Sequence, residues 1–441
     1  MEYTRLGRTG LSVSRTSFGA LPIQRIPESE STAILRAAYE AGINFYDTAN
    51  AYTDSEFKLG QALGDVRRNI IIATKTAPAA PDVMQQHLEQ SLKMLRTDYI
   101  DIYQLHCAPR VYRPGEEDGV YDWLLQKKKE GAIRHISVTA HRIGVAEEAL
   151  ESGLYDTLQY PFSVIADERE LRLAQRAKEL DIGFIAMKAM AGGLIQHPEV
   201  TFAFLRQYPQ VVPIYGIQRR SELNQWLSLE NDPPQWNEEM QRLAAEEKAA
   251  LGGDFCRSCG YCMPCPMGIE IPNAARMSLL MTRAPYQPYI TKEWQAKMHK
   301  IESCINCRRC VAHCPYSLDT PRLLDRYYRL KSDPRIVFAG QMTGVEGYVE
   351  SCASGFLAGV ELARRLNGQT PVDFPAETAI GALGLYVSNG SVGDFQPMNI
   401  NFGIIPPLDH RVKGKRNKNA ELSRRSLDIL SQTIEQEVLY T

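Results

Sequence analysis

Short apolar runs alternate with amphipathic helical patterns along the first half of this 441-residue chain. Apolar runs bounded by turn residues predict buried strands, and apolar residues at three- and four-residue spacing predict helices, as in residues 31–42 and 167–181. The expected strands are residues 16–21, 43–48, 69–75, 99–106, 133–140, 156–162, 182–189 and 211–217. Helices are expected to end at Gly42, Gly131, Gly153 and Asp181.

Eight strand–helix units favour a closed parallel (β/α)₈ TIM barrel over residues 1–230, and therefore an α/β fold class. A doubly wound open sheet also fits the alternation, but no G-x-G-x-x-G follows the first expected strand. Closure of the barrel is the prediction.

Four reactive side chains follow three neighbouring strands of the predicted barrel. Asp47 and Tyr52 follow the second strand, Lys75 the third and His106 the fourth. Chemistry in such barrels occurs at the C-terminal ends of the strands, so these side chains should meet at one mouth. We expect Tyr52 to act as general acid, Lys75 to lower its pKa, Asp47 to hold Lys75, and His106 to orient a carbonyl oxygen. Each residue alone also has a structural reading, as a cap, a solvated amine or a core histidine.

The segment GINFYDTANAYTDSE (42–56) resembles the signature of the aldo-keto reductases, and the resemblance covers roughly residues 3–230. It implies NAD(P)H-dependent reduction of an aldehyde or ketone, without a flavin or a catalytic metal. It also places Asp47, Tyr52, Lys75 and His106 at the family's catalytic tetrad.

The resemblance carries over to the nicotinamide contacts less evenly. Thr139 stands where the family has a Ser-Asn pair, and Gln159 matches the family's glutamine. Met187, followed by Lys188, stands where an aromatic residue usually stacks on the nicotinamide.

The segment after the eighth strand resembles the family's phosphate-binding segment. Gly216 opens it, and Arg219 or Arg220 could bind a 2′-phosphate through a bidentate guanidinium, which favours NADPH, with NADH as the alternative. The alternative is that both arginines are solvated residues at a helix start. The family usually has an asparagine late in this segment, and Trp226 occupies the nearest position here.

Two cysteine runs dominate residues 254–332. They hold eight of the ten cysteines, in the order C-x2-C-x2-C-x2-C-P and C-x2-C-x2-C-x3-C-P. The second form is that of bacterial ferredoxins, in which the fourth cysteine ligates the other cluster. We predict two [4Fe–4S] clusters in a small, mainly helical, ferredoxin-like domain. Their ligands would be Cys256, Cys259, Cys262 and Cys314 for one, and Cys304, Cys307, Cys310 and Cys265 for the other.

Structural zinc and disulfides are the alternatives for these cysteines. Zinc sites usually use two CxxC pairs, and disulfides suit small secreted frameworks.

Residues 231–253 look like a linker with one acidic helix. The CGYCMPCPMGIEIP segment (259–272) resembles the iron–sulfur tail of one aldo-keto reductase branch. Nicotinamide delivers a hydride whereas a cluster moves single electrons. The clusters are therefore either structural or regulatory, or coupled through a flavoprotein or ferredoxin partner.

Residues 333–441 resemble the C-terminal end of the folate- and FAD-dependent tRNA (uracil-5-)-methyltransferases. GQMTGVEGYVES (340–351), ETAIGALGLYVSN (377–389) and FQPMNINFGIIPPL (395–408) match in order, and a helix N-terminus after Gly344 would favour a phosphate. The dinucleotide-binding half of that FAD site is missing, so FAD binding and methyl transfer by this chain alone are not expected. We expect Cys352 to be a buried small residue and not a nucleophile.

Composition sets few further bounds. A net charge of −2 gives no general attraction to nucleic acid or membranes. The basic run 411–425 is either a solvated surface or a contact for tRNA phosphates. The N-terminus lacks the apolar segment of a signal peptide. Cysteines that bind iron as thiolates need a reducing compartment, so we expect a cytoplasmic location. The leading interpretation is a carbonyl reductase with two clusters. The alternatives are an electron-transfer protein and a tRNA-associated protein.

Overall fold

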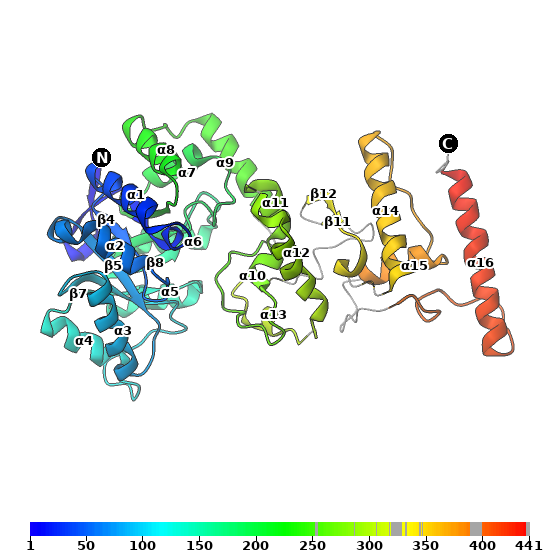
Figure 1. Ribbon diagram of the computed structural model, residues 1–441, viewed down its shortest axis with the longest axis horizontal. Coiled ribbons are helices and arrows are strands. Elements are labelled where there is room, and N and C mark those ends of the chain that lie inside the picture. Colours follow the sequence, from blue (N-terminus) through cyan, green and yellow to red (C-terminus); the bar gives the residue numbers. More distant parts are fainter. Residues whose placement is uncertain are drawn as a thin grey trace. The chain divides into compact units, whose positions relative to one another are not determined.

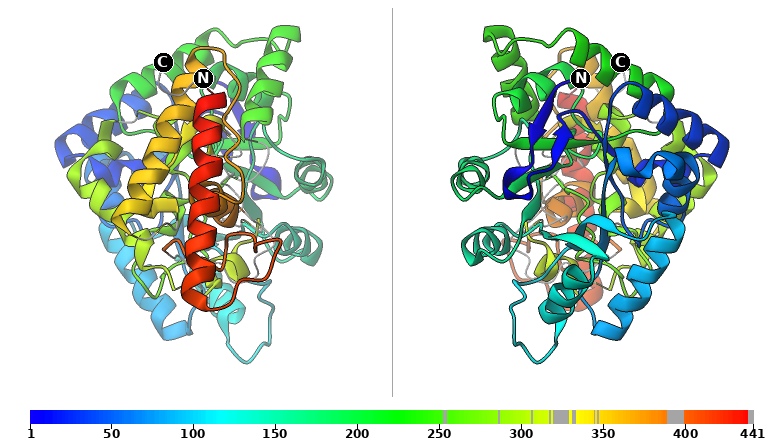
Figure 2. Two further views of the ribbon diagram at one scale, coloured as in Figure 1. Left: turned by 90° about the vertical axis from the view of Figure 1, so that its right-hand side faces the viewer. Right: turned by 90° about the vertical axis from the view of Figure 1, so that its left-hand side faces the viewer.

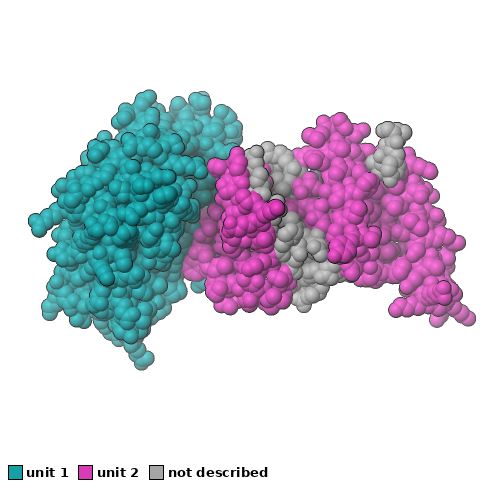
Figure 3. Space-filling model, viewed as in Figure 1, with its two compact units in different colours: residues 1–252 teal, residues 253–441 magenta. Residues whose placement is uncertain are grey.

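The computed structural model describes residues 1–251, 255–285, 287–305, 307–316, 318, 329–330, 333–343, 345, 347–388 and 399–437. The chain divides into two compact units, residues 1–252 and 253–441 (Figure 3). The predicted boundaries after residues 230, 253 and 332 stay predictions.

The first unit is the predicted (β/α)₈ barrel (Figure 1). Its eight strands are parallel and close in the order β10-β3-β4-β5-β6-β7-β8-β9, with β10 pairing β3. The strands are β3 (Ser17–Gly19), β4 (Phe45–Asp47), β5 (Ile71–Thr76), β6 (Ile100–Leu105), β7 (Ile133–Thr139), β8 (Thr157–Pro161), β9 (Gly183–Met187) and β10 (Val211–Gly216). Each of the eight predicted strands is thus confirmed.

Helices follow the strands around the barrel. They are α1 (Glu28–Glu40), α2 (Ser55–Leu63), α3 (Pro81–Met94), α4 (Val120–Glu130), α5 (Ile143–Ser152), α6 (Glu168–Glu179), α7 (Pro198–Arg206), α8 (Arg220–Asn231) and α9 (Glu238–Leu251). Short 3₁₀ turns are η1 (Gly7–Thr9), η2 (Leu21–Arg25) and η3 (Gly64–Asn69). The helix α9, predicted as a linker helix, packs against α7 within the first unit.

Local sequence explains where these helices begin and end. Asp167 caps α6, because its carboxylate accepts the Glu170 N–H at 2.9 Å and Glu170 accepts the Asp167 N–H in return. Gly131 and Gly153 end α4 and α5 with φ of 79° and 69°, in the left-handed region that glycine adopts at low cost. These glycines stop the helices so that the chain can enter the next strand.

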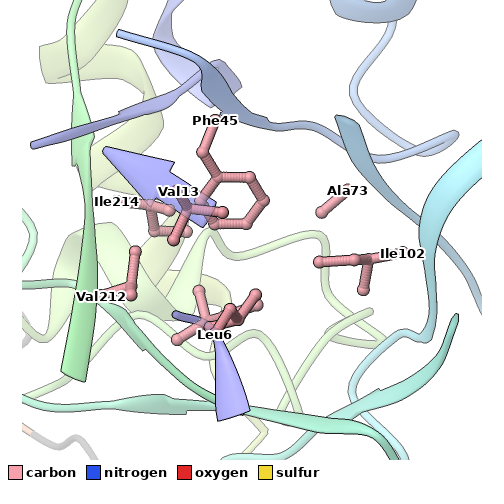
Figure 4. Close-up of a cluster of buried hydrophobic side chains, with 8 residues drawn as sticks. Leu6, Val13, Phe45, Ala73, Ile102, Val212 and Ile214 are labelled. Atoms are coloured by element: carbon pink, nitrogen blue, oxygen red, sulfur yellow. The ribbon is translucent and has the colours of Figure 1, made fainter. Parts of the chain in front are cut away.

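An N-terminal hairpin that the sequence did not predict adds to the barrel core. Strands β1 (Tyr3–Arg5) and β2 (Ser12–Ser14) pair antiparallel. Leu6 and Val13, both fully buried, pack with Phe45, Val212 and other barrel residues (Figure 4). A Cβ on Gly7 would lie 2.2 Å from the Gly183 backbone nitrogen, so only glycine allows this close approach.

The described elements of the second unit are mainly helical. They are α10 (Ile271–Ala274), α11 (Met277–Arg283), η4 (Gln287–Ile290), α12 (Lys292–His299), η5 (Lys300–Ser303), α13 (Arg309–His313), β11 (Arg329–Leu330), β12 (Asp333–Val337), η7 (Gly340–Thr343), α14 (Tyr348–Leu366), α15 (Ala379–Ser388) and α16 (Lys415–Gln436). An ion pair at 2.9 Å joins Arg364 of α14 to Glu437, which directly follows α16 (yellow and red helices in Figure 2). In the part of the chain that the structure describes, no helix is long and apolar enough to cross a membrane.

Candidate active site

The four predicted catalytic residues lie at the C-terminal ends of neighbouring barrel strands. Asp47 is the last residue of β4, Lys75 lies one residue before the end of β5, and His106 directly follows β6. Tyr52 lies in the loop between β4 and α2. Barrel closure therefore brings residues from three consecutive strand ends to one mouth.

Asp47 and Lys75 form a buried ion pair. The Lys75 Nζ donates to Asp47 Oδ1 at 2.6 Å and to the Thr48 carbonyl oxygen at 2.6 Å. The exposed fractions of Lys75 and Asp47 are 1% and 2%. Burial raises the pKa of Asp47, and the Lys75 charge opposes that shift, followed by hydrogen bonds from Gln104 and Gln159. Burying either group at this depth without the other would be costly.

Tyr52 faces both Lys75 and His106. The Lys75 Nζ lies 5.3 Å from the centroid of the Tyr52 ring, and the Tyr52 and His106 rings meet edge to face at 5.8 Å. Burial raises the pKa of Tyr52 well above its usual range, and the charges of Asp47 and Cys107 raise it further. The expectation was that Lys75 lowers this pKa, whereas burial of the phenol dominates and raises it. Tyr52 consequently keeps its proton across the working pH range.

His106 is neutral in this site. Burial lowers its pKa to about 3, and the positive charge of Lys75 acts in the same direction. A neutral imidazole has one N–H to donate and one nitrogen that accepts. His106 can therefore donate a hydrogen bond to a carbonyl oxygen without bringing a second positive charge beside Lys75.

Two of the predicted nicotinamide contacts are register partners on the next two strands, β7 and β8. Thr139 ends β7, and its hydroxyl oxygen accepts the Cys107 N–H at 2.7 Å. Gln159 lies in β8 and is 2% exposed. Its Oε1 is fully buried and has no hydrogen-bond partner among the described atoms. A buried acceptor without a donor is costly, and the carboxamide N–H of a nicotinamide is a donor of the right kind.

The other predicted cofactor residues lie at the ends of β9 and β10. Met187 ends β9 and is half-buried, and Lys188 follows it with φ of +57°. Gly216 ends β10 and is exposed, as are Arg219 and Arg220 at the start of α8. Both arginines are thus accessible to an anion.

Glu222, which the sequence analysis missed, lies at the same helix start. Its Oε2 accepts the Gln218 N–H at 2.8 Å and the Arg219 N–H at 3.0 Å. A carboxylate therefore already occupies backbone donors that a phosphate would otherwise use. The signal was available, since a glutamate three residues after the expected helix start is typical of a capping box.

Two further polar residues near the catalytic pair were also missed. Glu56, which is 4% exposed, accepts the Thr74 hydroxyl at 2.5 Å, and burial raises its pKa. Gln104, fully buried in β6, donates from Nε2 to Asp47 Oδ2 at 2.9 Å. Glu56 could have been found, because it lies within the motif 42–56. Nothing in the sequence of β6 indicates that Gln104 donates a hydrogen bond to Asp47.

The loop 107–120, between β6 and α4, contains Tyr112 and two arginines, Arg110 and Arg113, whose charges could attract an acidic substrate. Arg110 pairs with Glu116 at 2.7 Å and with Asp118, and it lies over the Tyr112 ring at 4.2 Å. Arg113 pairs with Glu148 at 2.9 Å. Because carboxylates already neutralise both guanidinium groups, this loop gives no support to an acidic substrate.

The eight cysteines of the two runs lie in the second unit and form no disulfide. Over the described ranges, no group of three or more His, Cys, Asp or Glu side chains lies close enough to hold one metal ion. The thiols are nevertheless near one another. Burial raises the pKa of Cys256, and the charges of Cys259 and Cys314 also raise it. Burial likewise raises the pKa of Cys310, and Cys304 and Cys307 add to the shift. Cys314, the fourth cysteine of the second run, is therefore near Cys256 of the first run, as the predicted ligand set requires.

The tail contains an exposed apolar groove on α14. The groove has a volume of about 580 Å³ and is lined by Tyr348, Val349, Cys352, Ala353, Phe356, Phe374, Ile380, Leu430 and Ile434. Cys352 was expected to be buried, and this was wrong, because it lies on the exposed side of α14. The helix start predicted after Gly344 is present, because α14 begins at Tyr348 with Gly347 before it, and the anion site there stays a prediction. Gly344 itself and residues 395–398 of the third tail motif lie outside the described residues.

The basic run 411–425 lies before and along the first half of α16. Lys415, Arg416 and Lys418 are exposed, whereas Arg425 donates to the Pro407 carbonyl oxygen at 2.9 Å. Arg424 pairs with Glu421. Part of the positive charge is therefore accessible to solvent and part stabilises the tail.

Comparisons with known proteins agree with the two resemblances seen in the sequence. Residues 16–201 match the model of the aldo/keto reductase family, and residues 287–370 match that of glucose inhibited division protein A. A solved aldo-keto reductase, AKR11C1 from Bacillus halodurans, aligns with a TM-score of 0.50 at 21% identity, over 56% of this chain and 96% of that one. This likeness supports the barrel fold.

The tail has relatives among the methylenetetrahydrofolate–tRNA-(uracil-5-)-methyltransferases, TrmFO. The protein from Heliobacterium modesticaldum is 48% identical over 120 residues, 27% of this chain and 27% of the relative. The one from Desulfitobacterium hafniense is 48% identical over 163 residues, 36% of this chain and 37% of the relative. This chain thus spans well under half of the length of these relatives. It joins an N-terminal aldo/keto reductase domain to a C-terminal segment similar to glucose inhibited division protein A and TrmFO.

Proposed function

We propose that this protein is an oxidoreductase that reduces an aldehyde or ketone with NADPH, with Tyr52 as the general acid. The buried Asp47–Lys75 pair, with Tyr52 and His106 beside it at one barrel mouth, is the observation that carries the proposal. Bound NADPH would supply a hydride to the carbonyl carbon.

The roles of the side chains follow from their charge states. The neutral His106 would donate a hydrogen bond that orients the carbonyl oxygen. Tyr52 would then give its proton to that oxygen as negative charge develops there, because an alkoxide is a stronger base than a phenolate. Lys75, held by Asp47, would stabilise the phenolate that remains.

Gln159 gives independent support for a nicotinamide in this mouth. Its unpaired, buried Oε1 would gain a donor from the carboxamide, and the Thr139 hydroxyl lies at the end of the neighbouring strand. Arg219 and Arg220 would bind the 2′-phosphate of NADPH through their guanidinium groups, while Glu222 occupies the nearby backbone N–H groups of Gln218 and Arg219.

The proposal is tested by anaerobic oxidation of NADPH against a panel of aldehydes and ketones. The wild type should turn over at least one of them, and Tyr52→Phe should lose most of that activity while still binding NADPH. Tyr39→Phe, in which a half-buried tyrosine of α1 changes outside the mouth, is the matched control. No carbonyl-dependent oxidation, or equal rates for both variants, would refute the proposal.

We also propose that the two cysteine runs hold two [4Fe–4S] clusters with the ligand sets given above. The spacing of the runs supports this, together with the position of Cys256 within electrostatic reach of Cys259 and Cys314. An anaerobic preparation should contain about eight iron and eight sulfide per chain. Tightly bound zinc without sulfide would contradict it. Reduction of the clusters by NADPH only when a flavoprotein or ferredoxin is added would favour the electron-transfer interpretation.

A role with tRNA is a second candidate, because Lys415, Arg416 and Lys418 are exposed on a segment similar to TrmFO. Binding should then weaken as salt rises and fall with Lys415→Ala/Arg416→Ala/Lys418→Ala. Equal binding by this variant, or none by the wild type, would rule it out.

A further inference from the structure

A chain of buried polar groups leads from the catalytic ion pair into the barrel wall. The Gln104 Nε2 donates to Asp47 Oδ2 at 2.9 Å, while Lys75 occupies Oδ1. On the next strand, the Ser137 hydroxyl lies 3.1 Å from Gln104 Oε1. The Thr157 hydroxyl, one strand further, donates to Ser137 Oγ at 2.6 Å. Three consecutive strands, β6, β7 and β8, thus support one carboxylate.

The direction of these hydrogen bonds is fixed by chemistry. An ionised carboxylate only accepts, so the Gln104 amide must turn its NH₂ toward Asp47 and its oxygen toward Ser137. Ser137 has one proton and two acceptors in reach, Gln104 Oε1 and the Thr157 carbonyl oxygen at 3.0 Å. When that proton points to Gln104, the amide orientation is locked and each end of the amide is satisfied.

We propose that Gln104 is a positioning residue that keeps Asp47 ionised with Oδ1 turned toward Lys75. The inference rests on the proposed function, since it assigns Gln104 a part in that reaction. The side-chain amide of Gln104 donates to Asp47, although Lys75 is its register partner on β5. It acts through Asp47, and Ser137 acts through Gln104.

The need for such a residue follows from the burial of Asp47. Lys75 from β5 pairs with it, and Tyr52 from the β4–α2 loop lies in its field. His106 after β6 and Glu56 from α2 are the titratable groups that interact with Lys75. Burial raises the pKa of Asp47, and donors to its oxygens oppose that shift. Without Gln104, Oδ2 would lose a donor in a dry site, and the carboxyl could take a proton or rotate away from Lys75.

The test compares Gln104→Met, Ser137→Ala and the matched control Ser17→Ala. Ser17 is a fully buried serine on β3 whose hydroxyl donates to the Ser14 carbonyl oxygen. Two quantities are measured: the pH profile of kcat, and the titration of Asp47 by carboxyl-region infrared spectra with Asp47→Asn as the subtraction reference. Circular dichroism establishes that each variant is folded.

A hydrogen bond to a charged group corresponds to about one to two pKa units. Activity needs ionised Asp47, so it falls as pH drops through the pKa of Asp47. Gln104→Met raises that pKa and should move both the acidic limb of the profile and the infrared titration up by about one to two pH units. KM should change less than kcat. Ser137→Ala should give a smaller shift in the same direction, and Ser17→Ala none.

The two readouts separate the inference from the proposed function. Unshifted titration in a folded Gln104→Met variant would overturn the positioning role, as would an equal shift in Ser17→Ala. A wild type without carbonyl reduction, but with the infrared shift present, would refute the proposed function and leave Gln104 as the group that keeps Asp47 charged.

Discussion

Replacing Lys75 by methionine should destabilise the barrel in a pH-dependent way. The change leaves Asp47, which is 2% exposed, without the ammonium that now lies 2.6 Å away. Removing one partner of a buried ion pair costs about 3–5 kcal/mol. For a unit of this size that corresponds to a fall of roughly 6–20 °C in the melting temperature. Gln104 still donates to Asp47, so the lower part of that range is expected.

The pH dependence has a definite sign. The folded-state pKa of Asp47 is raised already and rises further without Lys75, while the unfolded chain has the ordinary value of about 3.9. Between these values the folded variant binds a proton that the unfolded chain does not. The deficit should therefore be largest at alkaline pH and shrink as pH falls through the folded-state pKa.

The assay is thermal unfolding of the full chain, followed by near-ultraviolet circular dichroism from pH 5 to 9. Asp47→Asn/Lys75→Met, which removes both charges, should recover part of the loss. Arg172→Met, which breaks an exposed pair with Glu168 at 3.6 Å, should leave the transition nearly unchanged. An unchanged transition in Lys75→Met, or a deficit independent of pH, would refute the reasoning.

Three further predictions concern other parts of the chain. Glu222→Ala frees the backbone donors at the start of α8 and should lower KM for NADPH more than for NADH, and equal changes for both cofactors would contradict this. Gly60→Ala puts a Cβ 2.1 Å from the Met94 carbonyl oxygen and should lower the free energy of unfolding, measured in urea, by at least about 1–3 kcal/mol. The control Gly144→Ala meets no atom within 4 Å and should not lower it. Cys256→Ser should lower the iron and sulfide content of an anaerobic preparation by about half, and an unchanged content would remove Cys256 from the ligands.

Much of the barrel could be predicted from sequence because its signals are local. Each strand is an apolar run bounded by turn residues, and Gly131 or Gly153 ends a helix by its own backbone preference. The catalytic residues were found for the same reason, since Asp47 and Lys75 lie at strand ends and parallel strands bring those ends together.

Other features depend on contacts between segments far apart in the chain. The N-terminal hairpin packs Leu6 against residues of β4 and β10, and no local sequence pattern predicts this contact. The support of Asp47 by Gln104 needs the register of β6 against its neighbours. The expectation for Cys352 failed because small residues along α14 suggested a buried helix, whereas its outer side carries the exposed Tyr348 and Val349.

The most direct test of the central claim is the fate of the hydride. Anaerobic turnover with NADPH deuterated at both C4 positions, in ordinary water, should place one deuterium on the carbinol carbon of the alcohol product. Tyr52→Phe should bind the cofactor and form little of that product. An alcohol whose carbinol carbon carries hydrogen from the solvent would instead mean that electrons, and not a hydride, reach the carbonyl, and would contradict the account.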